Sequence, residues 1–371
     1  MNDYVKTYKS TDSKRSIPTA AKIIYALTAL TAVFHIISFF SSGLSDFINK
    51  YISSAIRFLL AKLTGLVPFS LAEALIFLLP ILAFLLIRFA VKNFSDSWRS
   101  VCVYMASMLS VACAFYVLFF WSFGVGYNTE AIDKKLGIER ESISAEELYE
   151  TAQLLCEKVN EASKNIHFRK KNFSVMPYSI SELSDKLCSA FENFTEENDI
   201  LSNMSSNLKP VIMSEAMSYT HITGVYTYFT GEANINVSFP DYTLPFTAAH
   251  ELAHQRGIAR EDEANFIAFL VCTESDDHYL KYSGYLSMLE YFLSAIYYTA
   301  PDLYPAIIQS LNYNTVYEMS AYHKFFDKYR DSFISDISSS INDAYLKLNG
   351  TEGEISYGLV IDLAVAYYKK Q

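Results

Sequence analysis

Charged residues are scarce in this chain: they make up 19% of its 371 residues, whereas about a quarter is usual in soluble domains. Cysteine is scarce as well, and the five cysteines are scattered, which excludes a disulfide framework and a C-x-x-C metal site. Internal repeats and low-complexity segments are absent, which excludes a repeat protein. The net charge of −10 and the pI near 5.3 argue against nucleic acid as a partner.

Apolar residues are in excess at the N-terminal end, and the mean hydropathy of the chain is positive, +0.14. Residues 21–42, 69–91 and 101–122 are each an apolar run long enough to cross a bilayer. Backbone groups in lipid must pair within their own segment, so these runs are predicted to be helices. The first run is too long for a signal peptide, and no small-residue cleavage site follows it. We therefore predict a membrane domain over residues 20–126 that follows a tail over residues 1–19.

The segment of residues 44–66, between the first two spans, has apolar residues at helical spacing and polar residues opposite them. This pattern is typical of a helix that lies in the membrane interface. An amphipathic connector that packs on the soluble domain has the same pattern, and both interpretations stay open. The apolar residues are Leu44, Ile48, Ile52, Ile56, Leu59 and Leu63, and the polar residues are Asp46, Lys50, Ser53, Arg57 and Lys62.

Basic residues near the spans predict the orientation of the chain. The N-terminal tail and the short loop between the second and third spans are rich in lysine and arginine, although the first loop also carries three basic residues. With three spans and a cytoplasmic tail, the soluble part, residues 127–371, is predicted to lie outside the cytoplasm. The sequence thus predicts a multi-pass protein of the cell membrane that contacts membrane lipids.

The octet HELAHQRG, residues 250–257, carries the strongest chemical signal. His250 and His254 lie four residues apart, so on a helix their imidazoles project from one face and can bind one zinc ion. Glu251, next to the first histidine, can then reach a water molecule on the open side of the ion. The motif predicts Zn²⁺ as the cofactor.

The flanking residues predict that the motif lies on a buried helix of about three turns. Asp241 and Thr243 offer N-cap oxygens, and Pro245 suits the first helical turn. Gly257 can turn the chain out of the helix. A second helical pattern follows, with three acidic residues in its first turn, where the helix dipole stabilises them.

A catalytic zinc has three protein ligands and one open position. A histidine six residues after the second motif histidine is one source of the third ligand, but Arg260 occupies that position. The other source is a glutamate on the second helix, commonly followed four residues later by a polar residue that orients a ligand histidine. Glu261 has Asn265 at that spacing, whereas Glu263 has Ile267, which cannot form a side-chain hydrogen bond. Glu261 is therefore the predicted ligand, with Asn265 supporting the site and Glu263 as the alternative ligand.

The run from Gly231 to Cys272, GEANINVSFPDYTLPFTAAHELAHQRGIAREDEANFIAFLVC, resembles the bacterial membrane-protein family DUF3810. The three spans, the string YSGYLSMLEY at residues 282–291 and the segment at residues 341–363 extend the likeness over nearly the whole chain. The family is similar to the Glu-zincin metallopeptidases. The resemblance implies a mainly α fold, in which residues 127–371 form a helix-rich, zinc-peptidase-like domain with a small β-sheet.

The rest of the soluble part is predicted to be helical except for one segment. Residues 225–239 are rich in β-branched and aromatic residues, which predicts strands. The resemblance implies that this segment forms the sheet edge on which an extended substrate pairs, and an ordinary core hairpin is the alternative. The predicted helices are residues 143–165, 180–195, 209–218, 279–299, 302–312, 315–348 and 357–370.

From these residues we expect a zinc-dependent endopeptidase that acts on a peptide or protein substrate, with Glu251 as the catalytic base. Tyr282 and Tyr285, in the matched string, are the best candidates for a hydroxyl that stabilises an oxyanion, and His221 and His323 are the alternatives. Two other interpretations stay open: a membrane sensor built on a zinc-peptidase fold, and a membrane scaffold without a metal.

Overall fold

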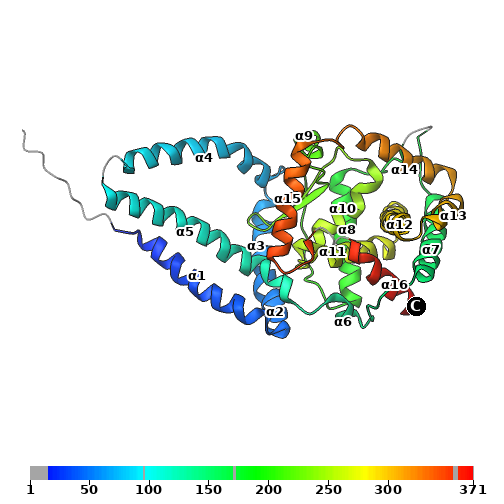
Figure 1. Cartoon of the computed structure of the whole chain (residues 1–371), viewed down its shortest axis with the longest axis horizontal. Coiled ribbons are helices and arrows are strands. Elements are labelled where there is room, and N and C mark those ends of the chain that lie inside the picture. Colours follow the sequence, from blue (N-terminus) through cyan, green and yellow to red (C-terminus); the bar gives the residue numbers. More distant parts are fainter. Residues whose placement is uncertain (1–15, 95–96, 170–172, 354–357, 371) are drawn as a thin grey trace, which may run out of the picture.

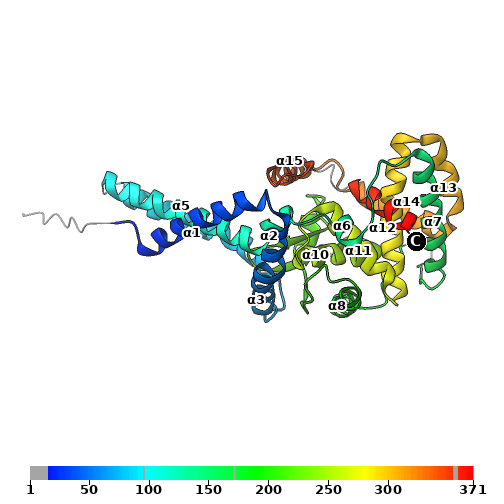
Figure 2. The same cartoon turned by 90° about the horizontal axis from the view of Figure 1, so that it is seen from below.

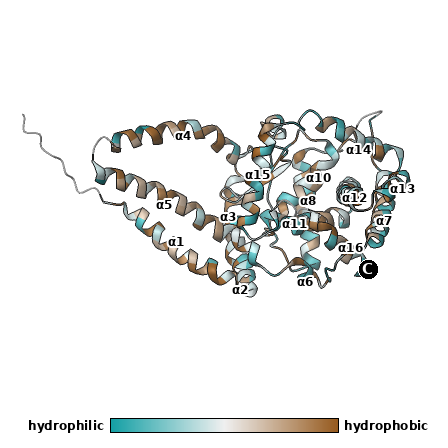
Figure 3. Ribbon diagram, in the orientation of Figure 1, coloured by the Kyte–Doolittle hydropathy of each residue, from teal (hydrophilic) through white to brown (hydrophobic). Residues whose placement is uncertain are grey.

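Three long apolar helices project from one end of the molecule (Figure 1, Figure 2). They are α1 (Thr19–Ser38), α4 (Leu71–Phe94) and α5 (Trp98–Ser122), and each contains a stretch long and apolar enough to cross a membrane. Their apolar side chains are largely exposed, as expected of surfaces that face lipid, and Figure 3 shows them as mainly hydrophobic. The prediction of three apolar N-terminal helices is confirmed. The computed structural model describes residues 16–94, 97–169, 173–353 and 358–370.

A further helical segment runs across the direction of the spans, where they meet the soluble part (Figure 2). Ser53 and Arg57, from its predicted polar face, are buried against the protein, whereas Leu59 and Leu63 are exposed. The segment therefore packs on the soluble part through polar residues and exposes apolar residues on its outer side. It consists of α2 (Ser42–Phe47), the π-helical η1 (Ile48–Ser53) and α3 (Ser54–Thr64).

Arg57 joins this segment to the last span and to the end of the motif octet. Its guanidinium is completely buried and donates hydrogen bonds to the side chain of Asn49 (2.9 Å) and to the carbonyl of Ser122 (2.8 Å). Burial lowers the pKa of Arg57 to about 10, so the group still carries its charge at neutral pH. Asn49 in turn donates to the carbonyl of Gly257 at 2.9 Å. Glycine is required there because φ is +107° and a Cβ would lie 2.5 Å from the guanidinium.

Buried charged side chains also join the second span to the soluble part. Glu232 accepts hydrogen bonds of 3.0 Å from the first two backbone N–H groups of α4, where the helix dipole favours a carboxylate. Glu73, on the same helix, accepts bonds of 2.9 and 2.7 Å from the backbone of residues 212–213. Lys209 donates to the carbonyl of Thr64 at 3.0 Å. Several separate hydrogen bonds of buried polar groups thus join the spans and the adjoining helices to the soluble part.

A small sheet of three strands, in the order β1-β3-β2, contains two of these charged residues. The central strand β3 (Glu232–Ile235) pairs in parallel with β1 (Leu208–Pro210) and antiparallel with β2 (Gly224–Thr227). Residues 224–235 therefore form a hairpin whose first strand, β2, is a sheet edge, and the predicted strand segment ends at Ile235 and not at residue 239. The predicted helix over residues 209–218 is wrong in its first half, because pairing with β3 outweighs the local preference and only α9 (Ser214–Ser218) is helical.

The rest of the soluble part is helical and shares one large hydrophobic core. The predicted helix over residues 315–348 is wrong as a single element, because a turn around Tyr329 divides it. Tyr329 is buried there, and its hydroxyl donates to Glu215 at 2.8 Å. The elements are η2 (Gly124–Asn128), α6 (Ile132–Leu136), α7 (Ala145–Ser163), α8 (Ile180–Glu197), η3 (Asp241–Thr243), α10 (Leu244–Gln255), α11 (Glu261–Glu274), α12 (His278–Thr299), η4 (Pro301–Leu303), α13 (Tyr304–Ser310), α14 (Tyr313–Phe326), α15 (Phe333–Leu348) and α16 (Val360–Lys370).

Candidate metal centre

The motif residues lie on α10, whose start differs from the predicted one. Neither predicted capping side chain caps the helix: Asp241 accepts a hydrogen bond from the backbone of Met176 (3.0 Å), and Thr243 bonds within the turn η3. A backbone N–H of the first turn bonds instead to Ser283 of α12 at 3.1 Å. Pro245 occupies the first turn as predicted. The helix is therefore held by a neighbouring helix more than by its own cap.

His250, His254 and Glu261 come together where α10 meets the start of α11. The two Nε2 atoms are 3.0 Å apart, and Oε2 of Glu261 lies 3.1 Å from the first and 3.3 Å from the second. Tetrahedral ligands at about 2.0–2.2 Å from zinc are roughly 3.3–3.6 Å apart, so these three atoms need to separate by only a few tenths of an ångström to hold one zinc ion. Among the described residues, these three form the one group of His, Cys, Asp or Glu side chains whose ligand atoms lie close enough together to hold a single metal ion.

The electrostatics of this cluster favour a cation. Burial by itself lowers the pKa of His254, but the Glu261 carboxylate raises it to about 9. Burial by itself raises the pKa of Glu261, but His254 and His250 hold it well below its ordinary value. The carboxylate is therefore ionised and attracts a positive charge, which is either a proton on the histidine or a metal ion in its place.

The two histidines of the cluster differ in their hydrogen bonds. Nδ1 of His254 lies 2.7 Å from the carbonyl of Ile258, which leaves Nε2 to face the cluster, and the ring of Phe123 packs edge-on at 5.8 Å. Nδ1 of His250 is buried and has no hydrogen-bond partner among the residues that the structure describes. Asn265 is buried and lines the pocket, where its side chain interacts with Tyr291 and not with either histidine. The predicted contact between Asn265 and a ligand histidine is therefore not formed.

Glu251 lies in the same pocket, outside the cluster of three. Burial raises the pKa of its carboxyl group, against the lowering effect of the two histidines. The backbone of β2 approaches it closely: Tyr226 donates a backbone hydrogen bond, and a Cβ on Gly224 would lie 2.6 Å from Oε1. A buried carboxyl group with a raised pKa beside His250, His254 and Glu261 is well placed to take up and release a proton.

These side chains line a pocket of about 660 Å³. One side is formed by β2 with the residues before it, and another by Phe123 and Tyr127, which follow the last span. The helix α15 lies over the pocket. It contributes Ser335, Ser338, Ser339, Asn342 and Tyr345.

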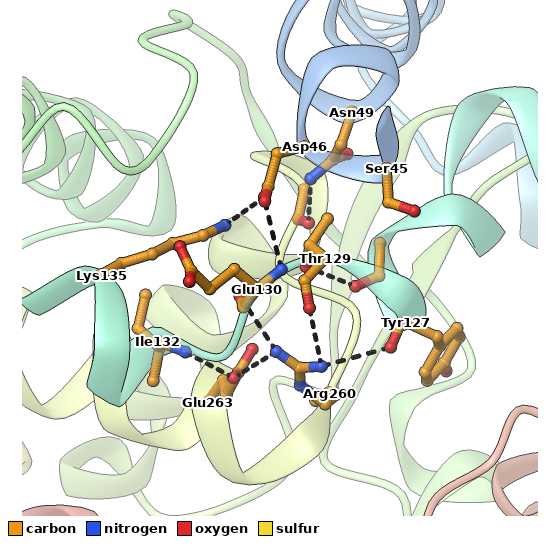
Figure 4. A network of polar contacts seen from close by, with 12 residues as sticks. Ser45, Asp46, Asn49, Tyr127, Thr129, Glu130, Ile132, Lys135, Arg260 and Glu263 are labelled. Atoms are coloured by element: carbon orange, nitrogen blue, oxygen red, sulfur yellow. Dashed lines mark hydrogen bonds and ion pairs between the residues drawn. The ribbon is translucent and has the colours of Figure 1, made fainter. Parts of the chain in front are cut away.

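Glu263, the alternative ligand, lies outside this pocket and binds elsewhere (Figure 4). Its Oε1 accepts hydrogen bonds from the backbone of Ile132 (2.8 Å) and from Arg260 (2.6 Å). Arg260 also donates to the carbonyl of Tyr127 at 3.2 Å. Arg260, the residue before Glu261, thus ties the start of α11 to the chain that follows the last span.

The structure does not bring Tyr282 and Tyr285 to the pocket, so it does not support their predicted role as oxyanion donors. Tyr282 is completely buried, and its hydroxyl donates to Glu318 at 2.5 Å. Tyr285 packs against Phe269, with ring centroids 6.1 Å apart. Both side chains belong to the core because of the way in which α12 packs.

The two alternative histidines are separated by the fold. His323 is exposed on α14 and lies outside the pocket, whereas His221 lines it. His221 has a φ of +62°, and its Nε2 lies 2.8 Å from the carbonyl of Tyr329. A left-handed backbone at a residue other than glycine is uncommon, and such residues cluster at functional sites.

Four tyrosines that sequence reasoning missed line the pocket: Tyr127, Tyr226, Tyr291 of α12 and Tyr345 of α15. Tyr291 ends the string YSGYLSMLEY and lies seven residues after Gly284, on the same helix face. At Gly284, α12 meets α11 so closely that a Cβ would lie 2.7 Å from that of Cys272. Gly284 is thus the residue in the sequence that could have indicated which face of α12 packs on α11 and carries Tyr291.

The comparisons with curated proteins and with solved structures gave no match. A family model, described as protein of unknown function (DUF3810), matches residues 44–365. The matched region begins in α2, includes the two following spans and contains every residue of the metal cluster. Because the match covers most of the chain, this protein belongs to the DUF3810 family.

Proposed function

We propose that this protein is a membrane-anchored, zinc-dependent endopeptidase. The observation that carries the proposal is the convergence of His250, His254 and Glu261 in one pocket with the buried carboxyl group of Glu251. A structural zinc is usually bound by four protein ligands, whereas a catalytic zinc is bound by three. The cluster of three among the described residues therefore supports a catalytic site.

Zinc held by His250, His254 and Glu261 would supply Lewis acidity, which lowers the pKa of water and polarises a peptide carbonyl. Glu251 takes the proton from the attacking water as the new carbon–oxygen bond forms. It then passes that proton to the nitrogen of the leaving amine as the carbon–nitrogen bond breaks. The raised pKa of Glu251 supports this exchange, because a more basic carboxylate takes up a proton more readily at neutral pH.

The strand β2 offers an extended substrate the backbone edge that does not pair with β3, and on this edge the N–H of Tyr226 already donates to Glu251. Thr223 accepts a backbone hydrogen bond from Asn236 across the hairpin, so Gly224 and Tyr226 direct their backbone groups away from β3. That edge lines the pocket next to Glu251. A peptide that pairs with it would lie along the metal ligands and the base.

Tyr345 is the group of the pocket that we propose as the oxyanion donor. Burial raises the pKa of Tyr345 to about 12, so its hydroxyl keeps its proton at neutral pH. Tyr127 donates to that hydroxyl at 3.3 Å, so the proton of Tyr345 can be donated to another acceptor. His221 reaches the same pocket, but its Nε2 donates to the carbonyl of Tyr329, so the neutral ring has no further N–H to offer. A preorganised donor such as the hydroxyl of Tyr345 stabilises the charge that develops on the carbonyl oxygen.

Gly224→Ala is expected to impair hydrolysis without loss of zinc. The new Cβ would lie 2.6 Å from Oε1 of Glu251, so the base must move, and its displacement should lower kcat at least about tenfold. The initial rate of peptide cleavage and the metal content are measured on the same sample. Gly43→Ala is the control, because a Cβ at that position meets no atom within 4 Å. An unchanged rate in Gly224→Ala would show that the base is not placed as proposed.

A peptide library incubated with the full chain in detergent tests the proposed activity. Cleavage, detected by mass spectrometry, should disappear when a chelator removes zinc and return when zinc is added. A zinc-loaded chain that cleaves no peptide would contradict the proposal. The second candidate function, a membrane sensor, would bind a peptide in the same pocket without cleaving it. The buried Glu251 favours hydrolysis, because binding alone has no use for a proton-exchanging group there.

We also propose that the soluble part lies outside the cytoplasm. The basic N-terminal tail is expected to lie in the cytoplasm, and three spans separate this tail from the soluble part. A membrane-impermeant thiol reagent applied to intact cells should label Asp276→Cys, at an exposed residue after α11, but not Ser10→Cys. The labelling of the wild-type chain, which has five cysteines, is subtracted as background. The reverse pattern would place the soluble part in the cytoplasm.

A further inference from the structure

The helix α15 is amphipathic and lies over the metal pocket. Its inner side contributes Ser335 and Tyr345 to the pocket. Its outer side is apolar and exposed: Phe333 is 76%, Ile341 65% and Leu348 86% exposed. In Figure 2 the helix stands apart from the helices of the core. Contiguous apolar surface of this kind is rare on soluble proteins and indicates a binding surface.

The contacts of Tyr345 place this helix at the level of the membrane surface. Its ring centroid lies 6.2 Å from that of Phe119, which is close to the end of α5. Tyr127, in the turn η2 that follows this span, donates to its hydroxyl at 3.3 Å. In Figure 1, α15 runs across the direction of α5, at the end of the span that joins the soluble part. The helix therefore lies along the bilayer surface that α5 reaches.

The metal cluster lies at the same level. Phe123, the residue after α5, packs against the ring of His254 at 5.8 Å. Phe119 of the span also packs against Tyr228, just after β2, at 5.1 Å. A peptide that enters between α15 and β2 therefore reaches the cluster beside the end of a span.

We propose that α15 rests with its apolar side in the surface of the membrane that the spans cross, and that the pocket below it takes peptide segments held at that surface. The second part rests on the proposed hydrolysis and names its substrate class: the stretch of a membrane-anchored chain next to its anchor. Amphipathic helices bind bilayer surfaces by burying their apolar side at the boundary of headgroups and acyl chains. The apolar side of α15 consists of Phe333, Ile334, Ile337, Ile341 and Leu348.

The charges of α15 indicate that apolar contact, and not attraction to anionic lipid, holds it there. The helix carries Asp336 and Asp343 against a single cation, Lys347. Lys347 forms an ion pair with Asp343 at 2.7 Å. A basic side is what amphipathic helices use to recognise anionic lipid, and α15 has none. A zwitterionic lipid is therefore the expected occupant of the apolar side.

Quenching of tryptophan fluorescence by brominated lipid tests the position of α15 in the full chain. Trp98→Phe and Trp121→Phe remove the two native tryptophans, and Ile337→Trp then reports from the apolar side. Tyr313→Trp, at an exposed residue of α14, is the matched control. In vesicles of phosphatidylcholine brominated near the headgroup end of its acyl chains, emission from Ile337→Trp should fall at least about twofold, and emission from the control should not change.

Equal emission from Ile337→Trp in brominated and ordinary lipid would overturn the proposal. A shift of that emission to shorter wavelength without quenching would also overturn it, because a second protein chain, and not lipid, would then cover the apolar side. Neither readout depends on hydrolysis.

The substrate class is tested with one cleavable sequence at two heights above a membrane. In one substrate the sequence directly follows a single span, and in the other a helical spacer of about 20 residues raises it by roughly 30 Å. Both are reconstituted with the zinc-loaded full chain, and the raised sequence should be cleaved at least about tenfold more slowly. Equal rates would overturn the substrate class. If neither substrate nor any free peptide is cleaved, the proposed hydrolysis fails, while the quenching result still decides the position of α15.

Discussion

Glu251→Gln is expected to lower the rate of peptide hydrolysis at least about a hundredfold, while the chain keeps its zinc and its fold. Glutamine has the shape of glutamate and can still accept the hydrogen bond from the backbone of Tyr226. It cannot accept a proton from water, so the step that forms the nucleophile is lost. The measurement is the initial rate on a cleavable peptide, beside metal content and thermal unfolding in the same detergent.

Glu290→Gln is the matched control for this variant. Glu290 is a partly buried carboxylate on α12 that accepts a hydrogen bond from Tyr242 at 3.1 Å, and it lies outside the pocket. Its replacement should leave the rate unchanged. Full turnover in Glu251→Gln would refute the mechanism, and loss of zinc in that variant would show that Glu251 supports the site and does not act as its base.

Purified full-length protein is expected to contain about one zinc ion per chain. His250→Ala, His254→Ala and Glu261→Ala each remove one of three ligands, and each should lower zinc affinity at least about a hundredfold. Competition with a chromogenic chelator measures the affinity, and metal analysis after dialysis gives the content. Thermal unfolding of the metal-free samples shows whether each variant still folds.

Two variants at neighbouring side chains serve as controls for metal binding. His221→Ala removes a histidine that lines the same pocket outside the cluster, so zinc should be retained. Glu263→Gln replaces a carboxylate that bonds to Ile132 and Arg260, so it too should keep its metal. If Glu261→Ala keeps its zinc and Glu263→Gln loses it, then Glu263, and not Glu261, is the ligand.

The residues of the metal cluster could be predicted because their relation is local in the chain. The spacing of His250 and His254 places them on one helix face whatever the rest of the fold does. Glu261 was preferred to Glu263 from the residue four positions later. The physical reason seen in the structure is a different one: Glu263 is engaged by the backbone of Ile132, which is 131 residues away in sequence.

The predictions that failed depend on contacts between distant segments. Tyr282 and Tyr285 belong to a string that resembles the family, but the side of α12 that faces the pocket is decided by its packing on α11. Residues 208–210 form a strand because β3 is there to pair with them. Arg57 has the sequence pattern of a surface charge, and its burial depends on the carbonyl of Ser122, 65 residues later.

Cutting the chain after residue 126 would not release an intact soluble part. The fragment would lose α3 and α4, and with them the backbone groups bound by the buried side chains of Glu232 and Lys209. The end of α10 would lose the contact of Asn49 with Gly257. A buried polar group left without its partner costs about 1–3 kcal/mol, and more if it is charged, so shedding from the membrane would unfold the region around the zinc ligands. The membrane segment is thus part of the folding unit that holds His250, His254 and Glu261 together.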